Sequence, residues 1–142
     1  MNYKQLLNFY FNAEALNGAM DGLAMRFATS SADGVKGCGY YAEKICRVIE
    51  AKVAMGELWN FLDGVLSSVT QEDRRVLSLY SQRRGRVSRG EHAAGAISNE
   101  DEKALHRVLM KFSRRVSGRL HRFAEQVNVL KNYYCLINVR GR

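Results

Sequence analysis

The amino-acid sequence predicts an all-α protein, in which a long N-terminal antiparallel helical hairpin is followed by a C-terminal three-helix unit. Three observations lead to this prediction. Apolar residues recur every three or four positions over long stretches, which is the period of one helix face. Proline, the residue most damaging to a helix interior, is absent from the 142 residues. Stretches rich in glycine and serine separate the periodic segments, as connections between helices do.

Residues 1–69 are expected to form the hairpin, with helices over residues 3–27 and 40–69. The short connection at residues 29–39 favours two antiparallel helices that bury their apolar stripes on each other. The first stripe is Leu6, Tyr10, Ala13, Leu16, Met20, Leu23 and Phe27, and the second is Tyr41, Ile45, Val48, Met55, Leu58, Leu62, Val65 and Val69. Further apolar residues are available for a homodimer interface, namely Phe9, Phe11, Trp59 and Phe61.

Residues 70–132 are expected to form the three-helix unit. Thr70 is a typical N-cap for a helix that ends near residue 84, because its hydroxyl can accept from the free amides of the first turn. Residues 85–98 are rich in Gly, Ala and Ser and predict a flexible loop. A fourth helix follows from residue 98 or 99, and Ser113 is expected to cap a fifth that ends at Leu130. The tail, residues 133–142, either packs back on the protein or forms a short strand.

Positive charge is concentrated in the second half of the chain. Residues 1–70 contain six Lys/Arg and seven Asp/Glu, a net charge of −1, whereas residues 71–142 contain sixteen and seven, a net charge of +9. Such an asymmetry indicates a polyanionic partner.

Several other classes of protein are disfavoured. The sequence has no phosphate-binding glycine loop, nucleophile elbow or HExxH motif, and the three histidines and three cysteines lack zinc-site spacing. We therefore expect no enzyme activity, no metal and no cofactor. No apolar run is long enough for a membrane span, and the odd cysteine count does not suggest a disulfide framework. The cytoplasm is the expected compartment.

A helix-turn-helix is the motif that best accounts for the basic half. The expected order is a helix, a turn at residues 110–112, and a recognition helix over residues 113–130 that begins SRRVSGRLHR. Arginines in such a helix can bind guanine edges in the major groove, and serines can hold phosphate. The candidate DNA-binding residues are Arg107, Lys111, Ser113, Arg114, Arg115, Ser117, Arg119 and Arg122. Arg83, Arg84, Arg86 and Arg89 extend the basic surface.

The same residues resemble a known family. RRVLSLY at residues 74–80 and FSRRVSGRLHRFAEQVNVL at residues 112–130 are similar to region 4 of sigma-70-type factors, in the form found in phage-derived transcriptional regulators of the ArpU and RinA kind. The resemblance implies a bacterial DNA-binding regulator that reads double-stranded DNA with residues 113–130. It also implies that residues 1–69 serve dimerisation or contact with RNA polymerase.

Two other interpretations of the basic residues remain open. Basic side chains on the polar face of an amphipathic helix often only keep that face solvated. Alternatively, the protein is a non-enzymatic interaction module whose basic face binds an acidic protein. Exposure of Arg114, Arg115 and Arg119 on one unobstructed face favours DNA, whereas burial or pairing with the protein's own acids argues against it.

Overall fold

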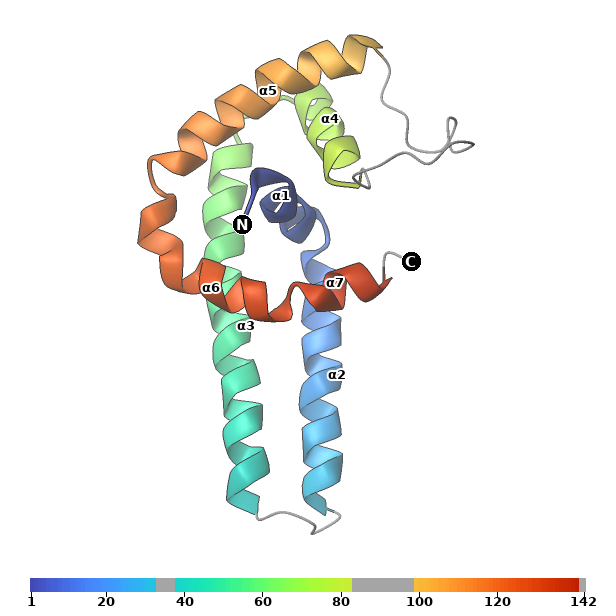
Figure 1. Ribbon diagram of the computed structural model, residues 1–142, viewed down its shortest axis with the longest axis vertical. Coiled ribbons are helices and arrows are strands. Elements are labelled where there is room, and N and C mark those ends of the chain that lie inside the picture. The colour runs from blue at the N-terminus through green and yellow to red at the C-terminus, as the bar shows by residue number, and fades with distance from the viewer. Residues whose placement is uncertain (33–37, 83–98, 141–142) are drawn as a thin grey trace. The chain divides into compact units, whose positions relative to one another are not determined.

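The computed structural model describes residues 1–32, 38–82 and 99–140, and these residues form helices without any strand (Figure 1). The all-α prediction is therefore confirmed for the described part of the chain. The residues divide into two compact units, each built from separate pieces of chain. Unit 1 comprises Met1–Phe11 and Phe61–Arg122, and unit 2 comprises Asn12–Asn60 and Phe123–Arg142.

Unit 1 contains helix α1 (Tyr3–Phe11), the C-terminal end of α3 (Cys38–Leu66), α4 (Gln71–Gln82) and α5 (Asn99–Ser117). Helix α4 packs against both α1 and α5. The unit has a closely packed apolar core to which all four helices contribute. Its buried side chains are Leu6, Leu7, Phe9, Tyr10, Leu62, Val65, Leu66, Val76, Leu77, Leu105, Val108, Phe112 and Val116.

Two helix starts in unit 1 follow from their capping residues. At α1, the amide of Gln5 donates to Oδ1 of Asn2 at 2.8 Å, and the amide of Asn2 donates to Oε1 of Gln5 at 3.1 Å, which is a reciprocal capping box. At α4, the amide of Asp73 donates to Oγ1 of Thr70 at 3.2 Å. The expected Thr70 cap is thus confirmed.

Unit 2 contains α2 (Ala13–Ala32), α3 up to Asn60, α6 (Ala124–Tyr133) and α7 (Cys135–Arg140). Helices α2 and α3 run side by side in opposite directions (Figure 1), and an ion pair between Lys52 and Asp21 connects them. The ammonium group of Lys44 also lies 5.5 Å from the ring centroid of Phe27. The buried side chains of this unit are Leu16, Met20, Val48, Ala51, Met55, Leu58, Leu130 and Ile137.

The structure corrects the expected N-terminal helix over residues 3–27. The chain forms two helices there, because α1 ends at Phe11 and α2 begins at Ala13. Asn12 lies between them, and its carbonyl accepts the hydrogen bond from the amide of Leu16 at 3.1 Å. Asparagine is a favoured residue at a helix start, so Asn12 is compatible with a break between the two helices.

The expected turn at residues 110–112 is also wrong. Helix α5 continues through it to Ser117, and the chain turns at Gly118 and Arg119. The expected recognition helix over residues 113–130 is therefore divided among the end of α5, the 3-10 helix Leu120–Phe123 and α6. The amide of Arg119 donates to the carbonyl of Val116 at 3.0 Å, so α5 closes with a tighter i→i+3 turn after Ser117.

Two smaller expectations need correction. The tail forms helix α7, so its strand alternative is wrong, while the buried side chain of Ile137 shows that this helix packs back on the protein. Phe9 belongs to the core of unit 1 with 1% of its surface exposed, so it is not available for a dimer interface. The expected loop at residues 85–98 lies outside the described residues.

Candidate nucleic-acid interface

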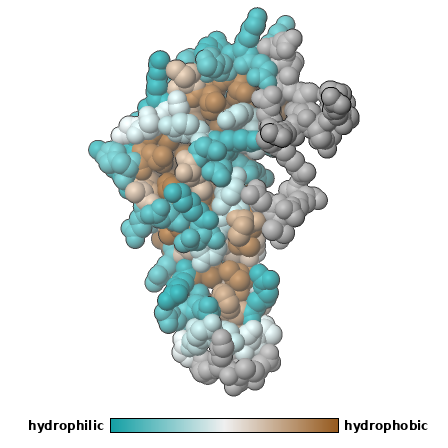
Figure 2. Space-filling model, in the orientation of Figure 1, coloured by the Kyte–Doolittle hydropathy of each residue, from teal (hydrophilic) through white to brown (hydrophobic). Residues whose placement is uncertain are grey.

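Helix α5 separates apolar from charged residues along its whole length. Leu105, Val108, Phe112 and Val116 follow one another at spacings of three and four, so they share one face, and all are buried. The ring of Phe112 meets the ring of Tyr3 edge-on, with 6.1 Å between their centroids. Figure 2 shows hydrophilic residues along the outer edge of α5 and hydrophobic residues beneath them. The buried face fixes which side chains of α5 point to solvent.

The outer face of α5 is basic. Lys103, Arg107, Lys111 and Arg114 lie at spacings of four, four and three, and all four are exposed. We call these four residues the basic face. Six of the eight predicted site residues are Lys or Arg. Arg107, Lys111 and Arg114 lie on the basic face, and Arg119 and Arg122 follow it in the chain. Arg115 lies off this face.

Acids and bases are also separated along the length of α5. Its first turn carries Glu100, Asp101 and Glu102, whereas the twenty residues 103–122 contain seven Lys/Arg and not one Asp/Glu. The helix dipole favours this order, because acids are stabilised at the N-terminus of a helix and bases at its C-terminus. The dipole explains the bases in the last turn of α5. It does not explain Lys103 and Arg107, which lie far from the C-terminus of the helix.

Three acids near the starts of α4 and α5 pair with arginines of unit 1. Arg75 donates to Oε1 of Glu72 at 2.5 Å and to Oδ1 of Asp101 at 2.9 Å. These hydrogen bonds hold the pKa of Arg75 above its usual value and the pKa of Glu72 below its usual value. A nitrogen of Arg107 also lies 3.8 Å from Oδ1 of Asp73. These carboxylates therefore do little to cancel the charge of the remaining bases.

The other bases of α5 and the following turn form no salt bridge with an acid that the structure describes. Within the described part of the chain, no carboxylate forms a salt bridge with Lys103, Lys111, Arg114, Arg119 or Arg122. Arg115 differs from its neighbour Arg114, because it donates a hydrogen bond to the hydroxyl of Ser68. Exposed, unpaired cations of one sign create a positive potential that attracts polyanions.

The predicted serine positions have local hydrogen bonds. The hydroxyl of Ser113 donates to the carbonyl of Met110 at 2.9 Å, and that of Ser117 donates to the carbonyl of Arg114 at 3.4 Å. Ser113 therefore lies inside α5 and does not cap a new helix, which corrects the sequence prediction. A serine in mid-helix can bond to a carbonyl of the preceding turn in this way.

A second polar cluster of unit 1 lies among α1, α3 and α4. The hydroxyl of Tyr10 donates to Oδ1 of Asp63 at 2.7 Å and accepts from a guanidinium nitrogen of Arg74 at 2.6 Å. Burial, together with the hydrogen bond to Asp63, raises the pKa of Tyr10 to about 12. The cluster joins three helices with one tyrosine, and this role is structural.

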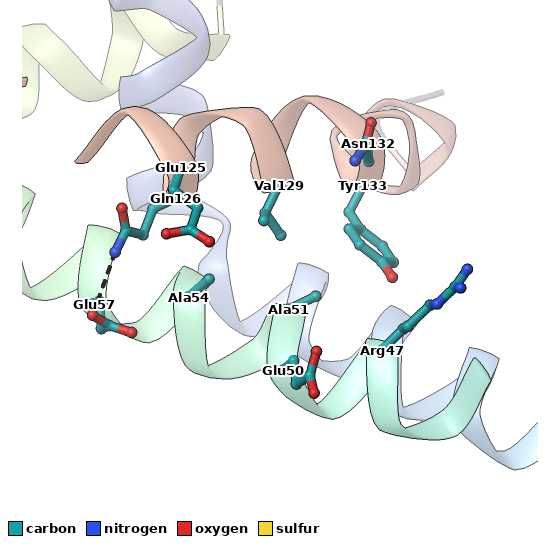
Figure 3. A pocket seen from close by; sticks show the side chains of 10 residues that line it. All are labelled: Arg47, Glu50, Ala51, Ala54, Glu57, Glu125, Gln126, Val129, Asn132 and Tyr133. Atoms are coloured by element: carbon teal, nitrogen blue, oxygen red, sulfur yellow. Dashed lines mark hydrogen bonds between the residues drawn. The ribbon is translucent and has the colours of Figure 1, made fainter. Parts of the chain in front are cut away.

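Unit 2 has a pocket of about 390 Å³ between α3 and α6 (Figure 3). Val129 and Tyr133 reach from α6 toward α3, and Nε2 of Gln126 donates to Oε2 of Glu57 at 3.4 Å. Its charged lining residues are Arg47, Glu50, Glu57 and Glu125. None of the described residues that line this pocket is a Ser, Cys or His.

In residues 1–32, 38–82 and 99–140, no group of three or more His, Cys, Asp and Glu side chains is placed to hold a metal ion. None of the described helices is both long and apolar enough to cross a membrane. Cys46 and Cys135 are free thiols on the surface, and His106 and His121 are exposed. Arg83, Arg84, Arg86, Arg89 and His92 lie outside the described residues.

Comparisons with protein-family models, with curated proteins and with solved structures found no match.

Proposed function

We propose that this protein binds double-stranded DNA through the basic face of α5 and the two arginines that follow it, Arg119 and Arg122. The observation that carries the proposal is the stretch 103–122, with seven Lys/Arg and no acid, in which all the bases except Arg107 have no salt bridge to a described carboxylate. Phosphate contacts by Lys and Arg supply most of the affinity in DNA binding that does not depend on sequence.

The proposed binding mode differs from the helix-turn-helix expected from the sequence. Since α5 continues through residues 110–112, the basic face belongs to one helix, which includes the expected turn and the first residues of the expected recognition helix. An α-helix of this kind fits the width of the major groove, and its bases also reach phosphates on either side. The resemblance to sigma region 4 supports a role in transcription regulation in a bacterial cytoplasm, with RNA polymerase as a further partner.

Fluorescence anisotropy with a random-sequence duplex tests the proposal across a salt series. We expect Kd values of about 1–100 µM near physiological salt, and a log–log slope of about −4 to −5, because each neutralised phosphate contributes roughly −0.9. Replacing both Lys111 and Arg114 by Ala removes two contacts, so the slope becomes shallower by about 2. Arg26→Ala, an exposed arginine of unit 2, serves as the matched control and leaves the slope unchanged.

The adjacent arginines of α5 provide a sharper comparison. Arg114 faces solvent without a salt bridge, whereas Arg115 is hydrogen-bonded to Ser68. We expect Arg114→Ala to weaken DNA binding more than Arg115→Ala does. Equal losses would contradict the assignment of the basic face. Absence of binding even at low salt would reject DNA as the partner, and an acidic protein that is captured from nuclease-treated lysate and released by Lys111→Ala with Arg114→Ala would replace it.

A further inference from the structure

Helix α3 exposes a second seam, of small and apolar residues that end at Asn60, opposite the residues that it buries. The seam residues are spaced by alternating intervals of three and four over 22 residues, roughly 33 Å of helix. They are Gly39, Ala42, Cys46, Ile49, Val53, Gly56 and Asn60, and all of them are exposed. Ile49 and Val53 at its centre have 54% and 60% of their surface exposed. We call these seven residues the exposed seam.

The exposed seam has the repeat of a coiled coil. Its spacing averages 3.5 residues, which places Gly39, Cys46, Val53 and Asn60 at a positions and the other three at d positions. A helix with apolar residues on two sides is usually covered on both. Within unit 2, the opposite side of α3 is covered, since Val48, Ala51, Met55 and Leu58 are all buried.

A glycine in the seam supports contact with another helix. A Cβ atom at Gly56 would meet nothing within 4 Å, so packing inside the chain does not require a glycine there. In a helix interior, glycine costs about 1 kcal/mol relative to alanine. Gly18, Gly22 and Gly64 lie off the seam and are equally open, so Gly56 permits the close approach of a partner helix but does not require it.

The neighbouring helices leave the seam open. Helix α2 meets α3 on one side through Lys52, and α6 meets it on the other side through Glu57. The seam lies between these two contacts on the helical wheel, about 150° from the buried face.

We propose that the exposed seam binds the same seam of a second copy of this chain, in a parallel and in-register coiled coil. The flanking charges select this arrangement. Glu43, Glu50 and Glu57 occupy the three e positions, so an antiparallel pair would bring glutamates of the two copies together. In the parallel pair each e position faces a g position, which places Glu57 beside Lys52 of the second copy. Lys52 also pairs with Asp21 of its own chain, and the g positions 45 and 59 are the uncharged Ile45 and Trp59.

Two seam residues agree with the parallel pairing. Val53 is β-branched at an a position, which favours two-stranded coiled coils. Asn60 occupies another a position, where an asparagine meets its counterpart and fixes the register. The occupant is therefore a second copy with the same polarity, since its seam supplies matching residues at every layer.

The oligomeric state in solution tests this proposal. Analytical ultracentrifugation after nuclease treatment and a high-salt wash is expected to give twice the mass of one chain. Replacing Ile49 and Val53 together by Asp should give the mass of one chain, with an unchanged helical signal in circular dichroism, because both residues are more than half exposed. The control Met25→Asp alters an apolar residue of α2 that is 68% exposed, and it should leave the dimer intact.

Cross-linking tests the orientation on the native surface. In the parallel pairing, Cys46 faces Cys46 of the second copy. A chain with Cys38→Ser and Cys135→Ser should therefore yield a covalent dimer with a short bismaleimide, and the Ile49→Asp and Val53→Asp changes should abolish it. The proposal is overturned by a single-chain mass at every concentration, by a dimer that survives both Asp substitutions, or by a dimer in which Cys46 does not cross-link.

Discussion

Helices α5 and α3 are both long, but they distribute their apolar residues differently. Helix α5 has one buried apolar face and an outer face of Lys and Arg. Helix α3 buries one side around Val48, Met55 and Leu58, and exposes a second seam around Ile49 and Val53. The difference teaches that charge and apolar exposure indicate different partners. A basic outer face suits a polyanion, whereas an exposed heptad seam suits another helix.

The largest effect should come from the buried face of α5. Phe112→Ala removes a ring that is 1% exposed and in contact with Tyr3, so the free energy of unfolding should fall by about 3–5 kcal/mol. Met110→Ala, on the exposed side of the same helix, should change it by no more than about 0.5 kcal/mol. Urea denaturation measures both, and similar losses for the two variants would show that α5 is not one-sided.

The two sides of α3 provide the second test. Leu58→Ala removes a fully buried side chain and should cost about 2–5 kcal/mol. Val53→Ala should cost little in dilute protein, and its cost should grow with protein concentration, because a dimer is stabilised by mass action. Urea midpoints at several concentrations distinguish the two variants. A concentration-independent effect of Val53→Ala would place this residue in the monomer core.

A smaller effect is expected at the polar cluster of unit 1. Tyr10→Phe removes the hydroxyl that joins Asp63 and Arg74, and this should cost about 1–3 kcal/mol at neutral pH. The folded state raises the pKa of Tyr10 from 10.0 to about 12, so it favours the neutral phenol. This stabilisation is complete below pH 10 and is lost as the pH rises toward 12.

The pH dependence has a direct check. Thermal unfolding between pH 9 and 12, followed in parallel for both proteins, should show the difference between the native chain and Tyr10→Phe narrowing as the pH rises above 10. A constant difference would mean that Tyr10 does not donate its proton to Asp63.

The smallest effects concern glycines in the long helices. A Cβ atom at Gly18 or Gly22 of α2 would meet nothing within 4 Å, so alanine there should raise the free energy of unfolding by about 0.5–1 kcal/mol. Gly56→Ala should stabilise the single chain to a similar extent while weakening the dimer, since the added methyl group lies on the exposed seam. Thermal unfolding and ultracentrifugation separate the two effects, and an unweakened dimer would argue against close approach at Gly56.

Much of the basic face could be predicted from the sequence, whereas the bounds of the helix that carries it could not. The exposed positions of Arg107, Lys111 and Arg114 follow from the apolar spacing of α5 alone. The turn was placed wrongly because Ser113 is equally suited to cap a helix or to bond to Met110 within one. Burial of Phe112 and Val116 on the same face as Leu105 decides in favour of a continuous helix.

The sequence by itself determined the all-α class, the Thr70 cap and the separation of charge, because each depends on local spacing or composition. Only the tertiary structure decided where the helices break, at Asn12 and Gly118, and which of the two apolar sides of α3 is buried. A helix end reflects competition between a cap and the continued burial of an apolar stripe. An apolar helix face, in turn, is buried only if another helix packs on it. The sequence of one helix does not specify which helix that is.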